Sequence, residues 1–177
     1  RKHSEHTTNQ HLETLKQFEN KNSEWKSYIE WFHTLPLFLD LNEIRVVHAC
    51  WDNENMDILG NINTVTKEFL QELNSDKHYK KSRLFIAVDE CLKGREENIP
   101  EGYSFKDKDG NERYEIRVSW YIDPEKSFYH DYYMEEIAEL NGKKVDTELL
   151  KKKTYYGEAE KPVFCGHYWF EGIPKKE

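Results

Sequence analysis

Two histidines that each follow a short apolar run are the residues of this chain with the clearest chemical potential. His48 follows residues 44–47 and precedes Ala49, and His167 follows residues 163–165 and Gly166. A short apolar run is consistent with a buried strand, and sheet proteins commonly keep their ligands at the carboxyl ends of strands. Because neutral imidazole is a common metal ligand, we predict that His48 and His167 meet at one metal ion. The alternative is a partly buried histidine whose ring bonds to a backbone carbonyl.

Other reactive residue types do not form a recognisable site. Cys50 lies two positions after His48 and shares its strand face, which does not allow the directed contact of a nucleophile with its base. The three cysteines are too widely spaced for a disulfide framework or a structural zinc site. Around Asp107 the glycine is at the fourth position, whereas a calcium-binding EF-hand loop has it at the sixth. The remaining six histidines are predicted to lie on the surface: His3, His6, His11, His33, His78 and His130.

Composition limits the class of protein. The 177 residues suffice for one domain with a core, and 14% of them are aromatic, each able to bury a large area. The net charge of −8 argues against a surface that binds a nucleic-acid duplex. No apolar run approaches the roughly 20 residues that a membrane span needs, so no membrane association is expected. An odd number of cysteines without disulfide spacing indicates the reducing cytoplasm.

The hydrophobic pattern predicts helices and strands in alternation. Apolar residues at helical spacing predict one helix that starts at residue 9 and a second that is capped by Ser23. Further helices are predicted at 53–59, at 64–73 with Thr64 as the cap, at 82–93 and at 134–140, and a turn or loop at 74–76. In the second helix, Trp25, Tyr28, Ile29 and Phe32 share one apolar face. Strands are predicted at 37–41, 44–47 and 163–165, with a β-hairpin over 103–120 whose turn is Asp109-Gly110. The predicted class is therefore mixed α/β or α+β.

Three stretches together resemble a known family. They are WFHTLPLFLDL and IRVVHACWD within residues 31–52, ECLKG and PEGYSFKDKDG within 90–110 followed by Arg117 and Trp120, and VFCGHYW at 163–169. Their order and context resemble the calcineurin-like metallophosphoesterases, in particular the branch of bacterial serine/threonine phosphatases and diadenosine tetraphosphatases. The resemblance covers most of the chain.

The resemblance implies a fold and a metal centre. The expected fold is the C-terminal portion of a β-sandwich flanked by helices, with an inserted helical region and a β-hairpin. His48 and His167 match the histidines of the His-Ala and Gly-His motifs, which bind one of two divalent ions (Mn, Fe or Zn). The Gly-Asp-x-His, Gly-Asp-x-x-Asp-Arg-Gly and Gly-Asn-His-Glu motifs are missing, as are the closing strands. We therefore expect residues 1–177 to be a single domain lacking the N-terminal metal-binding half. Such a chain carries no catalytic residue and is inactive alone.

The expected activity of the intact protein is hydrolysis of a phosphate ester or phosphoanhydride by a metal-activated water. Its substrate would be a phosphoprotein or a dinucleoside polyphosphate. Arg117 is a candidate contact for a phosphate oxygen, or else part of a solvated face. Asp52 either orients His48 from behind or caps the end of the strand. Trp51, Trp120 and Trp169 either stack on a nucleobase or pack in the core.

A function without catalysis remains open at this point. A domain that keeps the phosphoesterase fold can use an acidic, aromatic surface to bind a protein partner. The missing Gly-Asp and Asn-His motifs are compatible with either function, because the sequence before residue 1 decides between them.

Overall fold

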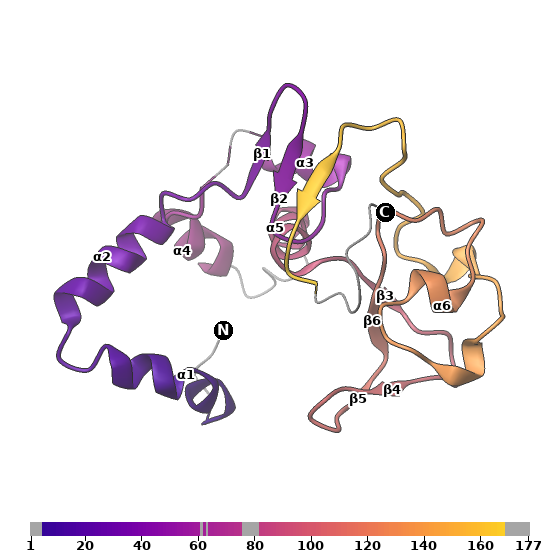
Figure 1. Cartoon of the computed structure of the whole chain (residues 1–177), viewed down its shortest axis with the longest axis horizontal. Helices are drawn as coiled ribbons and strands as arrows, with labels where there is room; N and C mark the ends of the chain where they lie inside the picture. The colour runs from indigo at the N-terminus through magenta and orange to yellow at the C-terminus, as the bar shows by residue number, and fades with distance from the viewer. Residues whose placement is uncertain (1–4, 61, 63, 76–81, 169–177) are drawn as a thin grey trace.

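The computed structural model describes residues 5–60, 62, 64–75 and 82–168, which form a mixed α and β structure (Figure 1). The helices are α1 (Glu5–Gln17), α2 (Asn22–Phe32), α3 (Asn53–Leu59), α4 (Lys67–Ser75), α5 (Arg83–Lys93) and α6 (Tyr129–Tyr132). The strands are β1 (Phe38–Asp40), β2 (Arg45–Val47), β3 (Glu96–Asn98), β4 (Phe105–Lys106), β5 (Glu112–Arg113), β6 (Glu115–Arg117) and β7 (Val163–Cys165). The predicted mixed class is confirmed at this coarse level. A bilayer-crossing helix is not found in the described part of the chain, since none of its helices has both the length and the apolar character.

A three-stranded sheet of order β1-β2-β7 positions both histidines of interest. Strands β1 and β2 are antiparallel, as the two apolar runs predict, and Phe38 pairs with Val47. Strand β7 runs parallel to β2, with Val47 opposite Cys165. Because parallel strands end at the same edge of a sheet, the residues that follow β2 and β7 lie side by side.

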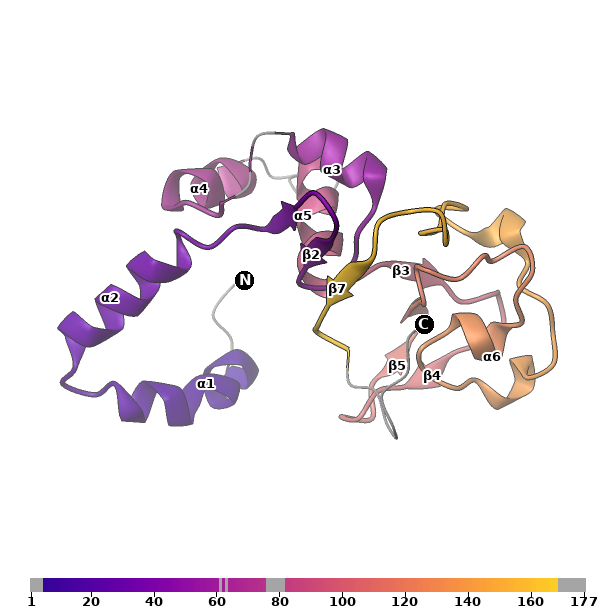
Figure 2. The same cartoon turned by 45° about the horizontal axis from the view of Figure 1, so that its top comes forward.

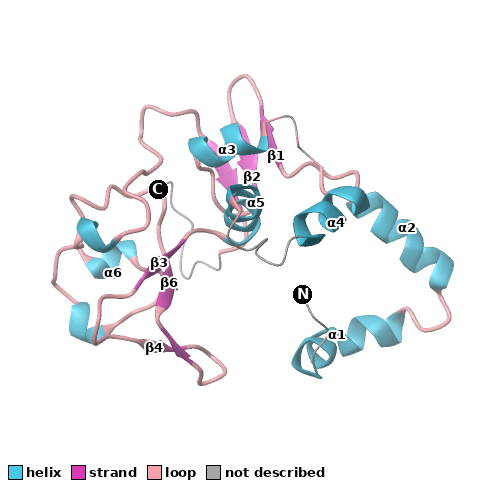
Figure 3. Cartoon of the chain, turned by 180° about the vertical axis from the view of Figure 1, so that it is seen from behind, coloured by secondary structure: helices cyan, strands magenta, loops and turns pink. Residues whose placement is uncertain are grey.

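One face of this sheet packs on helices and the other does not. Phe38, Val47 and Cys165 share the covered face, where the Phe38 ring packs edge-to-face on Trp51 at 5.6 Å. Figure 3, which is seen from the side opposite to Figure 1, shows α3 and α5 in front of this sheet. The same core contains Leu37, Cys50, Leu59, Phe69, Leu73, Ala87, Val88, Cys91 and Trp120. On the opposite face, Phe164 is 61% exposed.

A second core lies around the antiparallel pair β3 and β6. Tyrosines supply much of it, as the aromatic composition leads one to expect, together with Ile116 and Val118. Two short 3-10 helices, η2 (Ala138–Leu140) and η3 (Thr147–Leu149), line its edge. The chain thus has two hydrophobic clusters joined by the segment that follows α5.

The hairpin prediction is correct at its tip and wrong at its base. Strands β4 and β5 pair across the Asp109-Gly110 turn, where Gly110 has φ 80°. Strand β6 then leaves this hairpin and pairs with β3 instead. The predicted helix at 134–140 is also wrong, because Tyr133 forms a bridge with Val118 and the amide of Met134 donates to the carbonyl of Arg117. Pairing with β6 holds this segment extended, and only η2 remains helical.

The helix caps predicted at Ser23 and Thr64 are wrong, whereas a cap at Ser82 that was not predicted begins α5. Ser82 Oγ accepts from the amide of Phe85 at 3.1 Å, and α5 ends at Gly94 with φ 89°. Ser23 does not cap α2, which follows Lys21 without a side-chain cap. Thr66, rather than Thr64, accepts from the amide of Phe69, because Thr64 bridges to Pro36. Helix α4 continues to Ser75, where a turn was expected, and Asp76 lies outside the described residues.

Helices α1 and α2 extend away from the sheets (Figure 2). Phe18 joins them, with its ring edge-on to Trp25 and Tyr28. The apolar face predicted for α2 is largely exposed, and Trp31 and Phe32 each expose more than half of their surface. The helical pattern therefore predicted the helix correctly but not its burial.

Candidate metal-binding site

The rings of His48 and His167 face each other at the carboxyl ends of β2 and β7. His48 Nε2 lies 3.2 Å from His167 Nδ1, although 119 positions separate the residues in the sequence. Two imidazole ligands at about 2.1 Å from a tetrahedral metal lie about 3.3 Å apart, so the spacing fits a shared ion as well as a direct N–H···N hydrogen bond. The prediction that these histidines meet is confirmed, and their role as ligands stays a prediction.

The backbone around His48 is fixed on two sides. Its carbonyl accepts from the amide of Gly166 at 3.0 Å, which continues the parallel pairing beyond the strands. The next amide, that of buried Ala49, donates to the carbonyl of Cys91 at the end of α5 at 3.0 Å. The His48 ring itself is exposed and is directed at His167 rather than at a backbone carbonyl. The alternative of a carbonyl-bonded histidine therefore finds no support among the described contacts of this pair.

His167 has a strained backbone. Its φ is 66°, and the amide of Tyr168 donates to the carbonyl of Gly166 at 2.7 Å, which closes a three-residue turn around it. A side chain other than glycine in this left-handed region costs about 1–3 kcal/mol. Such strain persists only where the surrounding contacts enforce it, and it is concentrated at functional sites. The turn directs Nδ1 of His167 toward His48.

The electrostatic environment keeps His167 neutral. Burial, the charge of Arg117 and the neighbouring His48 together lower the pKa of His167 below 6.5. At pH 7 the His167 ring is therefore neutral, and neutral imidazole is the form of histidine that binds metals. Its Nε2 is buried and has no hydrogen-bond partner within the described ranges. In metal sites this second nitrogen usually donates to a carboxylate or carbonyl.

The described residues supply only part of a coordination sphere. They contain no group of three or more His, Cys, Asp or Glu side chains that could hold a metal ion. Two imidazoles at ligand spacing could fit one side of a divalent site, which would then need further ligands. The metal-binding role that the family resemblance assigns to them stays a prediction.

Asp52 caps a helix, a role that differs from both roles considered from the sequence. Its Oδ1 accepts from the amide of Asn55 at the start of α3. Its Oδ2 lies 2.5 Å from Nη2 of Arg95 and 3.4 Å from Nζ of Lys152. Burial raises its pKa, but Lys152 and Arg95 outweigh burial and hold it below 3.8. No hydrogen bond between Asp52 and His48 occurs in the part of the chain that is described.

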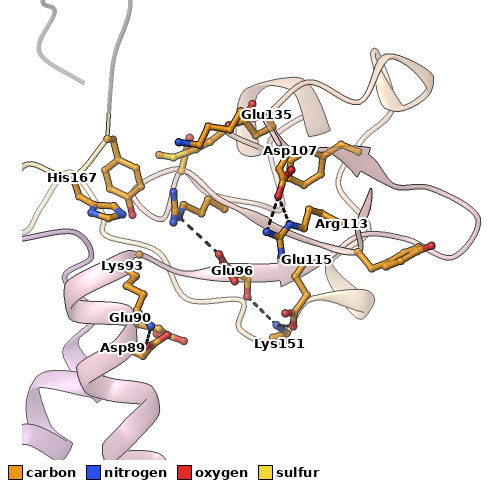
Figure 4. A pocket seen from close by; sticks show the side chains of 18 of the residues that line it. Asp89, Glu90, Lys93, Glu96, Asp107, Arg113, Glu115, Glu135, Lys151 and His167 are labelled. Atoms are coloured by element: carbon orange, nitrogen blue, oxygen red, sulfur yellow. Dashed lines mark hydrogen bonds and ion pairs between the residues drawn. The ribbon is translucent and has the colours of Figure 1, made fainter. Parts of the chain in front are cut away.

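Arg117 lines a large cleft together with His167, and Figure 4 shows this cleft from close by. The cleft has a volume of about 1760 Å³ and lies between α5 and strands β4 to β6, with His167 in its lining. The guanidinium of Arg117 is partly exposed, and its Nε is 3.8 Å from Glu96. That separation is longer than those of the neighbouring Arg113–Asp107 and Lys151–Glu115 pairs, both 2.6 Å. Arg117 is thus the least tightly held of these cations, and its role as a phosphate contact stays a prediction.

The remaining candidates are accounted for by packing. Trp51 and Trp120 are buried in the first core, so they do not offer a face to a base, and Trp169 lies outside the described residues. Cys50, Cys91 and Cys165 are free thiols, and burial raises the pKa of each. His33 was predicted to be a surface residue but is half-buried, with Nδ1 2.5 Å from the carbonyl oxygen of Val65. His11 and His130 are exposed, while His3 and His78 lie outside the described residues.

A buried charged cluster near the site was not predicted. Arg95 and Lys152 reach Asp52, Lys152 also bonds to Asn55 and Glu90, and Asn55 Nδ2 donates to Glu90 at 2.7 Å. The sequence gives one weak signal for this cluster, a Gly-Arg pair immediately after a helix. The residues that bond to one another in the cluster lie far apart in the sequence, around positions 52–55, 90–95 and 152, so local spacing could not identify them.

No family model, curated protein or solved structure matches this chain. The interpretation of the histidine pair therefore depends on its geometry and on the motifs around it.

Proposed function

We propose that this chain forms one side of a divalent-metal centre in a calcineurin-like metallophosphoesterase, with His48 and His167 as ligands. The observation that carries the proposal is the 3.2 Å approach of two imidazoles at the ends of parallel strands β2 and β7. The strain at His167 and its unpartnered Nε2 support it. When bound, Mn, Fe or Zn would polarise a phosphoryl oxygen and lower the pKa of a bound water.

The proposal assigns the rest of the centre to a longer protein. In the family, carboxylates and a catalytic histidine come from Gly-Asp and Asn-His motifs, which precede the region that this chain resembles. The β1-β2-β7 sheet would then form part of a β-sandwich, with Phe164 on the face that meets other strands. Residues 1–177 alone would hold the metal weakly and would not hydrolyse the substrate. Turnover by this chain in isolation would contradict that expectation.

The cleft beside His167 favours a phosphorylated polypeptide over a dinucleoside polyphosphate. Seven carboxylates line it together with six cationic side chains. A polyphosphate concentrates several negative charges, which so many carboxylates would repel. A polypeptide with one phosphorylated side chain presents both positive and negative groups, which can form ion pairs with the charged side chains that line the cleft. Arg117 would bind the phosphate, because its pairing with Glu96 is the loosest of the measured pairs.

The three free thiols support a reducing compartment, and we propose the cytoplasm as the site of action.

A second function is favoured by one observation, the exposed aromatic face of α2. A non-catalytic domain with the same fold would use Trp31 and Phe32 to bind a protein partner, and it would not require a metal. Metal content therefore separates the two proposals.

The test uses the full-length protein that contains this chain, with p-nitrophenyl phosphate and a phosphopeptide as substrates in the presence of Mn²⁺. Replacing both His48 and His167 by alanine should lower turnover at least 100-fold and reduce the bound metal. His130→Ala, which removes an exposed histidine beside Asp131, is the matched control and should retain full activity. Full activity of the double variant would rule out the proposed function.

A further inference from the structure

The segment that carries His167 contacts the end of α5 through Tyr168. A Cβ atom built on Gly94 would lie 2.1 Å from the Tyr168 hydroxyl oxygen and 3.0 Å from Cζ of the ring. The aromatic ring therefore occupies the space that any side chain at position 94 would need. Figure 4 shows His167 at the end of the cleft nearest this helix end.

The base of this contact is rigid. The amide of Gly94 donates to the carbonyl of Glu90 and closes α5, and Gly94 is buried. The next residue, Arg95, is anchored by its ion pair with Asp52 and by the amide of Val118, which donates to its carbonyl at 3.1 Å. A ring seated on Gly94 is therefore held by the core of the molecule.

His167 is enclosed between two fixed points. On one side, the amide of Gly166 donates to the carbonyl of His48, and on the other side Tyr168 rests on Gly94. Between them the chain must turn within one residue, and His167 adopts φ 66°. A left-handed backbone is unfavourable for histidine, and the one hydrogen bond described within the turn, from the amide of Tyr168 to the carbonyl of Gly166, depends on where Tyr168 is held.

We propose that Gly94 and Tyr168 are positioning residues, a clamp that holds His167 in its left-handed conformation with Nδ1 directed at His48. The consequence for metal binding rests on the proposed function, whereas the clamp itself does not. Neither residue would contact the metal or the substrate. Their effect would be to set the distance between the two imidazoles.

The chain offers a matched control for the clamp. Gly102 has φ 87°, close to the 89° of Gly94, but a Cβ there would meet nothing within 4 Å. Gly94→Ala and Gly102→Ala thus both place a Cβ on a residue with positive φ, and only the first displaces the Tyr168 ring. The measurements are the nuclear Overhauser effect between the rings of His48 and His167, the affinity for Zn²⁺ by calorimetry, and the melting temperature.

We expect Gly94→Ala to abolish the contact between the imidazoles and to weaken Zn²⁺ binding at least tenfold, while Gly102→Ala preserves both. Adding Tyr168→Phe to Gly94→Ala removes the atom at 2.1 Å and should recover part of the affinity. Tyr168→Ala leaves Gly94 unchanged and should also lose the contact, which covers the case in which Gly94→Ala does not fold.

Two results would overturn the clamp: an imidazole contact preserved in both Gly94→Ala and Tyr168→Ala, or a loss of equal size in Gly102→Ala. A full-length wild-type protein that shows the contact but takes up no Zn²⁺ would contradict the proposed function. The ring contact alone would then decide whether the clamp exists.

Discussion

Two polar clusters lie near the carboxyl end of β2, and they differ in how completely this chain satisfies them. The Asp52 cluster, made of Asp52, Asn55, Glu90, Arg95 and Lys152, brings two cations together with two carboxylates. The histidine pair, His48 and His167, brings together two imidazoles and no carboxylate. The first cluster balances its own charge, and the second is a partial ligand set.

The two clusters also differ in how fully their buried polar atoms are paired and in whether their backbone is strained. The Arg95 side chain is 2% exposed and pairs with Asp52, and only its Nε has no hydrogen-bond partner among the described residues. His167 has a left-handed backbone and a buried Nε2 for which the described residues offer no hydrogen-bond partner. Buried polar groups in folded proteins are normally paired, so a strained residue with an unpaired nitrogen is better explained by function than by stability. The comparison predicts that the two clusters respond oppositely to substitution.

The largest effect is expected in the Asp52 cluster. Asp52→Asn keeps an oxygen to cap α3 but leaves the buried guanidinium of Arg95 without its closest negative partner. Removing one member of a buried ion pair typically costs about 3–5 kcal/mol, and we expect a loss of this size in urea unfolding. Asp57→Asn, at an exposed position of α3, should change the free energy of unfolding by less than about 0.5 kcal/mol. A cost below about 1 kcal/mol for Asp52→Asn would remove the contrast between the clusters.

The histidine pair should show the reverse. His167→Gly relieves the left-handed strain and should raise the free energy of unfolding by about 1 kcal/mol relative to His167→Ala, which keeps the strain. Both variants should lose Zn²⁺ binding. Urea unfolding and calorimetry on the same samples measure the two effects. Equal stability of the glycine and alanine variants would show that the conformation of His167 carries no strain.

The smallest effect concerns the titration of two buried carboxyls. Lys152 and Arg95 overcome burial and lower the pKa of Asp52, whereas burial raises the pKa of Glu97 despite the amides of Lys151 and Lys152. Asp52 therefore stabilises the fold above its ordinary pKa of 3.8, and this contribution disappears as pH falls through its lower folded value. Glu97 favours folding in its protonated form, a contribution that is lost as pH rises through its raised pKa. Carbon-13 titration of the carboxyls should give a midpoint below 3.8 for Asp52 and above 4.5 for Glu97. The opposite order would show that the cations do not balance the cluster.

Local features could be predicted from the sequence because they depend on residues a few positions apart. The helix that ends at Gly94, the Asp109-Gly110 turn and the antiparallel pair β1 and β2 are all of this kind. The sequence also showed that His48 and His167 each follow an apolar run, and from this we predicted that they meet.

Only the tertiary structure decided which segments pair over long distances. Parallel pairing of β2 with β7 brings the histidines together, and pairing of β6 with β3 breaks the predicted hairpin and holds Met134 extended. The partners of Asp52 and the contact between Tyr168 and Gly94 arise in the same way. Local propensity cannot specify such contacts, because the free energy that selects them comes from burial and pairing between segments whose separation in sequence carries no signal. The sequence by itself therefore determined which residues can do chemistry, and the packing of the strands determined that two of them lie 3.2 Å apart.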